Sequence, residues 1–195
     1  MHQIEHKNPL DLHSFKHLAT PMNNQHPLQT LTTKRLLIRP LGLQDIADYF
    51  EIFGNPEISR YDDFAPITME EAASGMAEAI ENYQIPNHEL ELAVVETSSG
   101  KTIGILYFNP TQEPATIGYH FNESRHGRGY ASEALATWVA WLEENGHKTL
   151  KALVHPENKA SKRVLEKLGF HHHSTHTLPG SDTQEEVYIK NGEVI

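Results

Sequence analysis

The sequence contains no cysteine, and this absence excludes disulfides, thiolate metal ligands and cysteine nucleophiles. It also lacks a run of roughly 20 apolar residues, the length that a membrane-spanning helix needs. Basic residues are few, with 16 Lys and Arg against 26 Asp and Glu, for a formal net charge of -10. This balance disfavours nucleic acid and would attract cationic partners such as amines or basic peptide tails. We therefore expect a cytoplasmic protein with no membrane or nucleic-acid partner.

The chain has 195 residues, of which 38% are hydrophobic, enough for one domain with a sizeable core. Residues 1–30 are rich in His, Asn, Gln and Pro and show no sustained hydrophobic period. We interpret this segment as an N-terminal arm and residues 31–195 as the domain.

Hydrophobic periodicity predicts the secondary structure of the domain. Strands are expected at 35–39, 90–96, 102–108, 116–121, 150–154 and 185–190. Helices are expected at 43–53, from the capping box Thr68–Glu71 up to Pro86, at 131–145 and at 160–168. A meander of strands followed by alternating strands and helices indicates an α/β (mixed α+β) fold with helices packed on a central sheet.

The segment Thr116–Ala131, TIGYHFNESRHGRGYA, takes a strand through a glycine-bearing turn into a helix. The N-terminus of a helix offers unpaired N–H groups and a positive dipole end, which together can hold a diphosphate. Gly127 and Gly129 let the backbone approach a ligand closely, and Ser132 adds a hydroxyl. A simple tight turn explains this segment equally well. The dinucleotide fingerprint lacks its third glycine here, and the Gly-Lys-Ser/Thr of a P-loop is absent.

A second segment, Val154–Phe170, reads VHPENKASKRVLEKLGF. Together, GRGYASEAL and NKASKRVLEKLGF resemble motifs A and B of the GNAT acetyltransferases. The serine three residues after the asparagine, the opening TKRLLIRPLGLQDIADYFEIFGNPEI and the segment KTIGILYF are similar to the branch that acetylates ribosomal-protein N-termini. The resemblance covers roughly residues 31–190. It implies a mixed, mostly antiparallel central sheet flanked by helices, and transfer of an acetyl group from acetyl-CoA to a primary amine.

The resemblance also implies an acetyl-CoA site. Its residues would be Tyr119, Phe121, Asn122, His126, Gly127, Arg128, Gly129, Tyr130, Ala131, Ser132, Asn158, Ser161 and Arg163. His126 stands where the family has Arg or Gln, so only its backbone role carries over. Asn158 would bond a pantetheine amide and Ser161 would lie near the sulfur, although by themselves these residues fit a helix N-cap and a first-turn serine. The cations that could reach the adenosine phosphates are Arg128, Lys162 and Arg163.

The reaction needs a catalytic residue that acts as an acid toward the departing thiolate. Many members of the family have a tyrosine seven residues after the asparagine, but that position is Leu165 here. Ser161 is therefore the candidate acid, as the similar branch implies.

The attacking amine must be neutral, so the site also needs a base. Glu91 and His120 are our candidates, with Glu89 and Glu123 behind them. The family's carboxylate at a related strand position aligns near Thr116, which cannot serve as a base.

Two other classes of function are left open. A CoA-binding sensor without turnover would fit the missing tyrosine, and a metal-binding protein would fit the cluster His171, His172, His173 and His176. Alternation along a strand would split these imidazoles between two faces, so we expect no metal.

The acceptor would be selected by loops at 55–68 and 179–183, which carry no signature. The oligomeric state stays open, a homodimer included.

Overall fold

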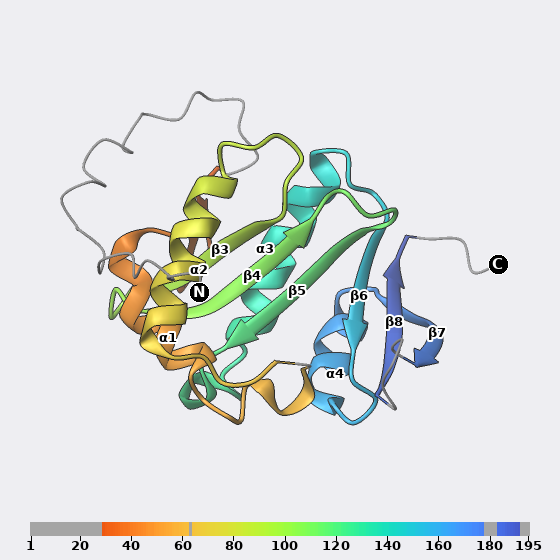
Figure 1. Cartoon of the computed structure of the whole chain (residues 1–195). Helices are drawn as coiled ribbons and strands as arrows, with labels where there is room; N and C mark the ends of the chain where they lie inside the picture. The colour runs from red at the N-terminus through yellow and green to blue at the C-terminus, as the bar shows by residue number, and fades with distance from the viewer. Residues whose placement is uncertain (1–28, 63, 178–182, 192–195) are drawn as a thin grey trace, which may run out of the picture.

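The computed structural model describes residues 29–62, 64–177 and 183–191, which form one eight-stranded sheet with helices on both faces (Figure 1). The strands are β1 (Leu31–Thr32), β2 (Leu36–Pro40), β3 (Leu90–Glu96), β4 (Thr102–Asn109), β5 (Ala115–Phe121), β6 (Leu150–Val154), β7 (His171–Thr177) and β8 (Gln184–Lys190). The α-helices are α1 (Ile46–Phe53), α2 (Met69–Asn82), α3 (Tyr130–Glu144) and α4 (Lys159–Lys167). Short 3-10 turns are η2 (Leu43–Asp45), η3 (Ser59–Tyr61) and η4 (Glu123–Arg125).

The sheet follows the order β1-β2-β3-β4-β5-β6-β8-β7. Neighbouring strands are antiparallel except for β5 and β6, which are parallel. The expected fold class, a mixed and mostly antiparallel sheet flanked by helices, is therefore confirmed.

The helices divide between the two faces of the sheet. The helices α1 and α2 pack on β4 and β3 on one face, and α3 lies behind the same strands on the other (Figure 1). The ring of Trp138 on α3 meets Phe108 of β4 with centroids 6.2 Å apart, and both residues are almost fully buried. Because the side chains of a strand alternate between faces, each strand can present one set of residues to α1 and α2 and another to α3 and α4.

A buried ion pair fixes the start of α1 against the sheet. Asp45 is 3% exposed and accepts two hydrogen bonds from Arg39, at 2.7 and 2.8 Å. Burial by itself would raise the pKa of Asp45, but the bonds from Arg39, Thr102 and the Gly42 N–H outweigh burial and hold this pKa below its usual range. The paired charges thereby position α1, which contributes residues to the candidate site described below.

The observed elements follow the expected ones closely, with two additions. The strands β1 and β7 were not predicted from the hydrophobic pattern. The proposed arm, residues 1–30, lies almost wholly outside the described residues, as does most of the loop 179–183, so the boundary near residue 30 stays a prediction. Within the described residues, no helix has the length and apolar character to cross a bilayer.

Candidate active site

The parallel strands β5 and β6 separate at their carboxyl ends. They pair only from Ala115–Ile117 to Leu150–Ala152, whereas β5 continues to Phe121 and β6 to Val154 (Figure 1). The helices α3 and α4 begin shortly after these two ends. The carboxyl ends of adjacent parallel strands are where open α/β sheets bind ligands. An extended ligand could add to the unpaired edge of β5 as an extra strand would.

The turn before α3 presents its backbone outward. Gly127 and Gly129 have φ angles of 72° and 78°, in the left-handed region that favours glycine, and both are exposed. A Cβ at Gly127 would meet nothing within 4 Å, which shows the open space beside the turn. Among the described residues, no hydrogen-bond acceptor is found for the N–H groups of residues 127–129. The first-turn N–H groups of α3, which include those of Ala131 and Ser132, have no acceptor within the helix either.

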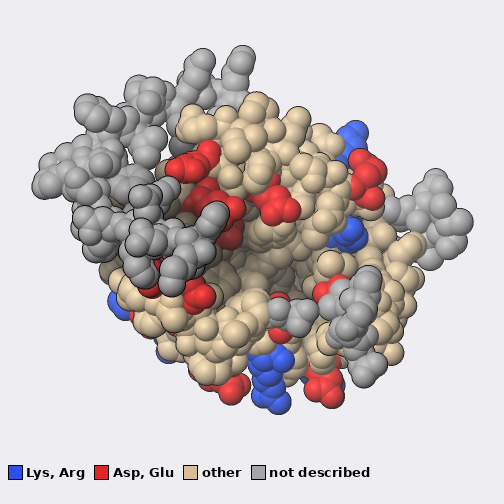
Figure 2. Space-filling view, in the orientation of Figure 1, with Lys and Arg blue, Asp and Glu red and all other residues tan. Residues whose placement is uncertain are grey.

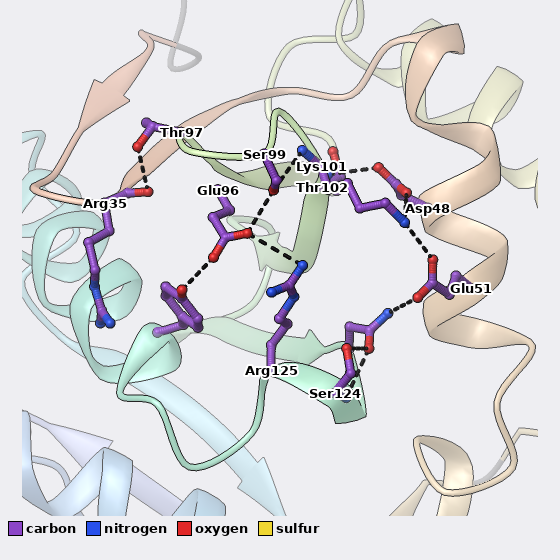
Figure 3. A network of polar contacts seen from close by, with 12 residues as sticks. Arg35, Asp48, Glu51, Glu96, Thr97, Ser99, Lys101, Thr102, Ser124 and Arg125 are labelled. Atoms are coloured by element: carbon purple, nitrogen blue, oxygen red, sulfur yellow. Dashed lines mark hydrogen bonds and ion pairs between the residues drawn. The ribbon is translucent and has the colours of Figure 1, made fainter.

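Two acids hold this turn in place, and sequence reasoning missed both: Glu133, which is half-buried, and Glu96, which is buried and is shown in Figure 3. Glu96, at the end of β3, accepts hydrogen bonds from the hydroxyl of Tyr130 and from Ser99, and pairs with Arg125 at 3.4 Å. Glu133 on α3 pairs with Arg35 at 2.6 Å. The Arg35 guanidinium also donates to the carbonyl of Arg128 and lies 4.2 Å from the Tyr130 ring centroid. These hydrogen bonds and ion pairs therefore hold the exposed turn in a fixed position.

Other residues that the sequence assigned to the acetyl-CoA site have side chains that bond to other parts of the protein. The His126 ring contacts the carbonyl of Phe121 at 2.8 Å, on β5. Asn122 caps η4 and also donates to Glu51, so its side chain is committed to the protein (Figure 3). Lys162 pairs with Glu186 at 2.7 Å. Of the three cations that the sequence analysis named for the adenosine phosphates, Arg128 and Arg163 are exposed.

The start of α4 carries two residues of the expected site. Asn158 is its N-cap, with Oδ1 accepting from the Ser161 N–H at 3.1 Å, so the N-cap reading is confirmed. Ser161 is not simply solvated, because its Oγ lies 2.8 Å from the hydroxyl of Tyr119. Burial raises the pKa of Tyr119 to about 12. Leu165 is fully buried in the core and cannot supply a polar group.

The opposite face of the sheet carries the two leading base candidates, His120 on β5 and Glu91 on β3. His120, next in sequence to Tyr119, points toward α1, where its ring lies 5.1 Å from that of Phe53 between centroids. It also contacts Asp62, the residue after η3, at 3.1 Å. Two neighbouring β5 residues thus reach opposite faces of the sheet at the point where β5 and β6 diverge. No residue type in the sequence marks this arrangement of the two side chains. The arrangement follows from the alternation of side chains along β5 and from the point where β5 and β6 stop pairing.

Glu91 lies on the same face as His120. Burial raises its pKa, while the neighbouring Tyr49 hydroxyl and His120 oppose that shift. Its Oε2 atom is buried and has no hydrogen-bond partner among the residues the structure describes. A carboxylate with a raised pKa and a free oxygen has the properties of a general base.

The remaining base candidates are tied to neutral partners. Glu89 accepts from Asn109, and Glu123 accepts from Asn55 at 3.0 Å. Thr116, which cannot act as a base, is buried and donates to Gln112. The charges of Glu78 and Glu89 act on Glu91, so this face is acidic. Figure 2 shows acidic side chains gathered beside a hollow of the surface, while the visible basic residues lie toward the outline.

The histidine cluster forms most of β7, an edge strand that pairs with β8 on one side. In the described part of the chain, no three His, Asp or Glu side chains lie together in a way that could hold a metal ion.

Comparison with known proteins identifies the class. The family described as acetyltransferase (GNAT) domain matches residues 35–171, and the chain therefore belongs to the GNAT acetyltransferase family and is an acyltransferase. The uncharacterized N-acetyltransferase p20 of Bacillus licheniformis is 26% identical over 147 residues, which cover 73% of this chain and 83% of that protein.

Solved structures show the same fold. A GNAT acetyltransferase from Bacillus anthracis superposes with a TM-score of 0.73 at 22% identity, covering 83% of this chain and 97% of the other. A ribosomal α-N-protein acetyltransferase in complex with coenzyme A superposes with a TM-score of 0.72 at 18% identity, with the same coverage of 83% and 97%. At these identities the similarity concerns the fold.

Proposed function

We propose that this protein transfers the acetyl group of acetyl-CoA to a primary amine, with the thioester lying between the diverging ends of β5 and β6. One observation carries the proposal. At this divergence, Tyr119 contacts Ser161 on one face of the sheet, and His120 lies on the other face, which also carries Glu91 of β3. An amine can then approach from the acidic face while the thiolate departs on the face of α4.

The residues present fit acetyl-CoA. The free N–H groups of residues 127–132 suit the diphosphate, because they combine outward-pointing amides with the positive end of the α3 dipole. The unpaired edge of β5, from 118 to 121, suits the amide groups of the pantetheine arm. Asn158 has its Oδ1 committed to the N-cap, so its amide nitrogen is the group left for the ligand.

Glu91 is the base that we place in this reaction. Its raised pKa, and an Oε2 that has no partner among the described residues, let it take a proton from an incoming ammonium, directly or through water. The neutral amine then forms the C–N bond and releases a second proton to water, the C–S bond breaks with its electron pair on sulfur, and Ser161 stabilises the thiolate. The acidic surroundings favour an amine that arrives as a cation, whether a small amine or the N-terminus of a protein.

Substitution of Gly129 by Asp tests the location of the diphosphate. Two like charges about 4 Å apart repel by roughly 4 kcal/mol at an effective dielectric constant of about 20, so acetyl-CoA should bind about 1,000-fold more weakly. Gly146→Asp is the matched control, because Gly146 also has a left-handed φ of 99° but lies beyond the other end of α3. Calorimetry with acetyl-CoA measures both affinities. Equal affinity in the two variants would remove the diphosphate from this turn.

A measurement of turnover distinguishes the enzyme from a CoA-binding sensor. Calorimetry gives the affinity for acetyl-CoA, and release of free thiol is then followed with a panel of small amines and peptides. Amine-dependent thiol release establishes the enzyme, whereas tight acetyl-CoA binding with no turnover across the panel would favour a sensor.

A further inference from the structure

The hydroxyl groups of Tyr119 and Ser161 form an isolated pair between β5 and α4. Their oxygens are 2.8 Å apart, and the Tyr119 hydroxyl is also 3.3 Å from the carbonyl of Ser161. Both residues are half-buried. Ser161 is the one hydroxyl-bearing residue of α4, and within the described residues Tyr119 is the hydrogen-bond partner of its Oγ.

The remaining contacts of Ser161 fix its backbone but leave its hydroxyl free to rotate. Its N–H is held by Asn158 at the N-cap, which sets the position of Cα and Cβ. A serine hydroxyl has a single hydrogen and rotates to suit its partners. If the oxygen accepts a bond from a neighbour, its own hydrogen must point elsewhere, and we place the thioester beside the unpaired edge of β5.

Tyr119 is suited to be that neighbour. Burial holds its pKa at about 12, so the phenol keeps its proton at neutral pH. A phenol is a more acidic donor than an aliphatic hydroxyl, so the stronger arrangement has Tyr119 donating and Ser161 accepting.

We propose that Tyr119 is a positioning residue, which donates its hydrogen bond to Ser161 Oγ and so turns the Ser161 hydrogen toward the departing sulfur. This rests on the proposed function, because it needs the thioester between β5 and β6. Ser161 donates a hydrogen bond and not its proton. Glu91 takes the proton of the incoming ammonium, and the nitrogen releases a second proton to water as the amide forms. The electron pair of the C–S bond stays on sulfur, and CoA leaves as a thiolate that later takes a proton from water.

The direct test titrates the thiol of bound CoA. A free thiol has a pKa of about 8.5, and a hydrogen bond to the thiolate lowers this value. The thiolate is followed by its ultraviolet absorbance, with protein plus desulfo-CoA as the blank. Bound CoA should titrate at lower pH in the wild type than in Tyr119→Phe or Ser161→Ala, and the double variant should match the single ones. Tyr188→Phe is the control, because it removes a hydroxyl from β8.

Kinetics supply a second readout. The rate constant kcat should fall about tenfold in Tyr119→Phe, the size expected for one lost hydrogen bond, with KM for acetyl-CoA within about twofold of the wild type. A purely structural role for Tyr119 would instead change KM and thermal stability without moving the thiol titration.

A fluorinated tyrosine at position 119 keeps the side chain in place and makes it a stronger donor. The bound thiol should then titrate at still lower pH, and an unchanged or higher value would overturn the proposal even if Tyr119→Phe failed to fold. An identical titration in wild type and Tyr119→Phe would also overturn it, while leaving the CoA site intact. Failure of the wild type to bind CoA would instead contradict the proposed function.

Discussion

At the scale of single residues, Glu91 sits in an environment that opposes its charge. Burial raises its pKa, and its Oε2 has no partner among the described residues. A raised folded-state pKa means that the protonated carboxyl favours the folded protein. This contribution is present below the ordinary glutamate value of 4.5 and is lost as the pH rises through the folded-state pKa. The residue therefore costs stability at neutral pH, as groups kept for catalysis often do.

Glu91→Gln should raise stability and lower activity together. The neutral amide imitates the protonated carboxyl, so the melting temperature should rise by about 2–4 °C at pH 7 to 8, for roughly 1 kcal/mol, and by almost nothing near pH 4. The rate constant kcat should fall about 100-fold, because general-base catalysis is lost. Glu78→Gln, which removes a nearby exposed charge, is the control for both measurements. A Gln variant that is as active as the wild type would show that another group is the base.

At the scale of elements, the sequence predicted features formed by residues close together along the chain. It did not predict features formed by residues far apart. The capping box of α2 was predicted and is present, with Glu71 bonded to the Thr68 N–H at 2.7 Å. The strand β7 was not predicted, because HHHSTHT has no apolar alternation and is extended through its pairing with β8. The contact of Tyr119 with Ser161 joins residues 42 positions apart, and no local pattern reveals the register that brings them together.

The attachment of α3 to β2 is a second long-range feature that local patterns could not show. Arg35 and Glu133 are 98 positions apart, and their ion pair fixes the first turn of α3. Arg35→Met removes this pair, the bond to the Arg128 carbonyl and the contact with the Tyr130 ring. The backbone amides that we propose to bind the diphosphate would then be less well fixed before binding. Calorimetry should therefore show an affinity for acetyl-CoA that is about 5- to 10-fold weaker.

Lys190→Met is the matched control for that variant. Lys190 pairs with Glu143 at 3.3 Å, near the other end of the same helix. If both variants lower affinity equally, the effect comes from general loosening of α3 and not from the turn at 127–132.

At the scale of the whole molecule, the formal charge of -10 acts together with the local arrangement of acids. Figure 2 shows carboxylates beside the hollow on the face that we assign to the acceptor. Acetyl-CoA is itself an anion, so the two substrates experience this charge in opposite ways. The α3 amides attract the anion locally, whereas the acidic face would draw in a cationic amine over a longer range.

This arrangement predicts that salt weakens catalysis selectively for cationic acceptors. The Debye length is about 10 Å at 0.1 M salt, so added salt screens the attraction between the acidic face and an approaching cation. With acetyl-CoA saturating, kcat/KM for a peptide bearing lysines near its N-terminus should fall about 5- to 10-fold between roughly 0.02 and 0.3 M salt. A peptide with neutral residues in place of those lysines should change less than twofold. Equal falls for both peptides would show that salt acts on the enzyme in general, and no fall for either would show that the acidic face does not steer the acceptor.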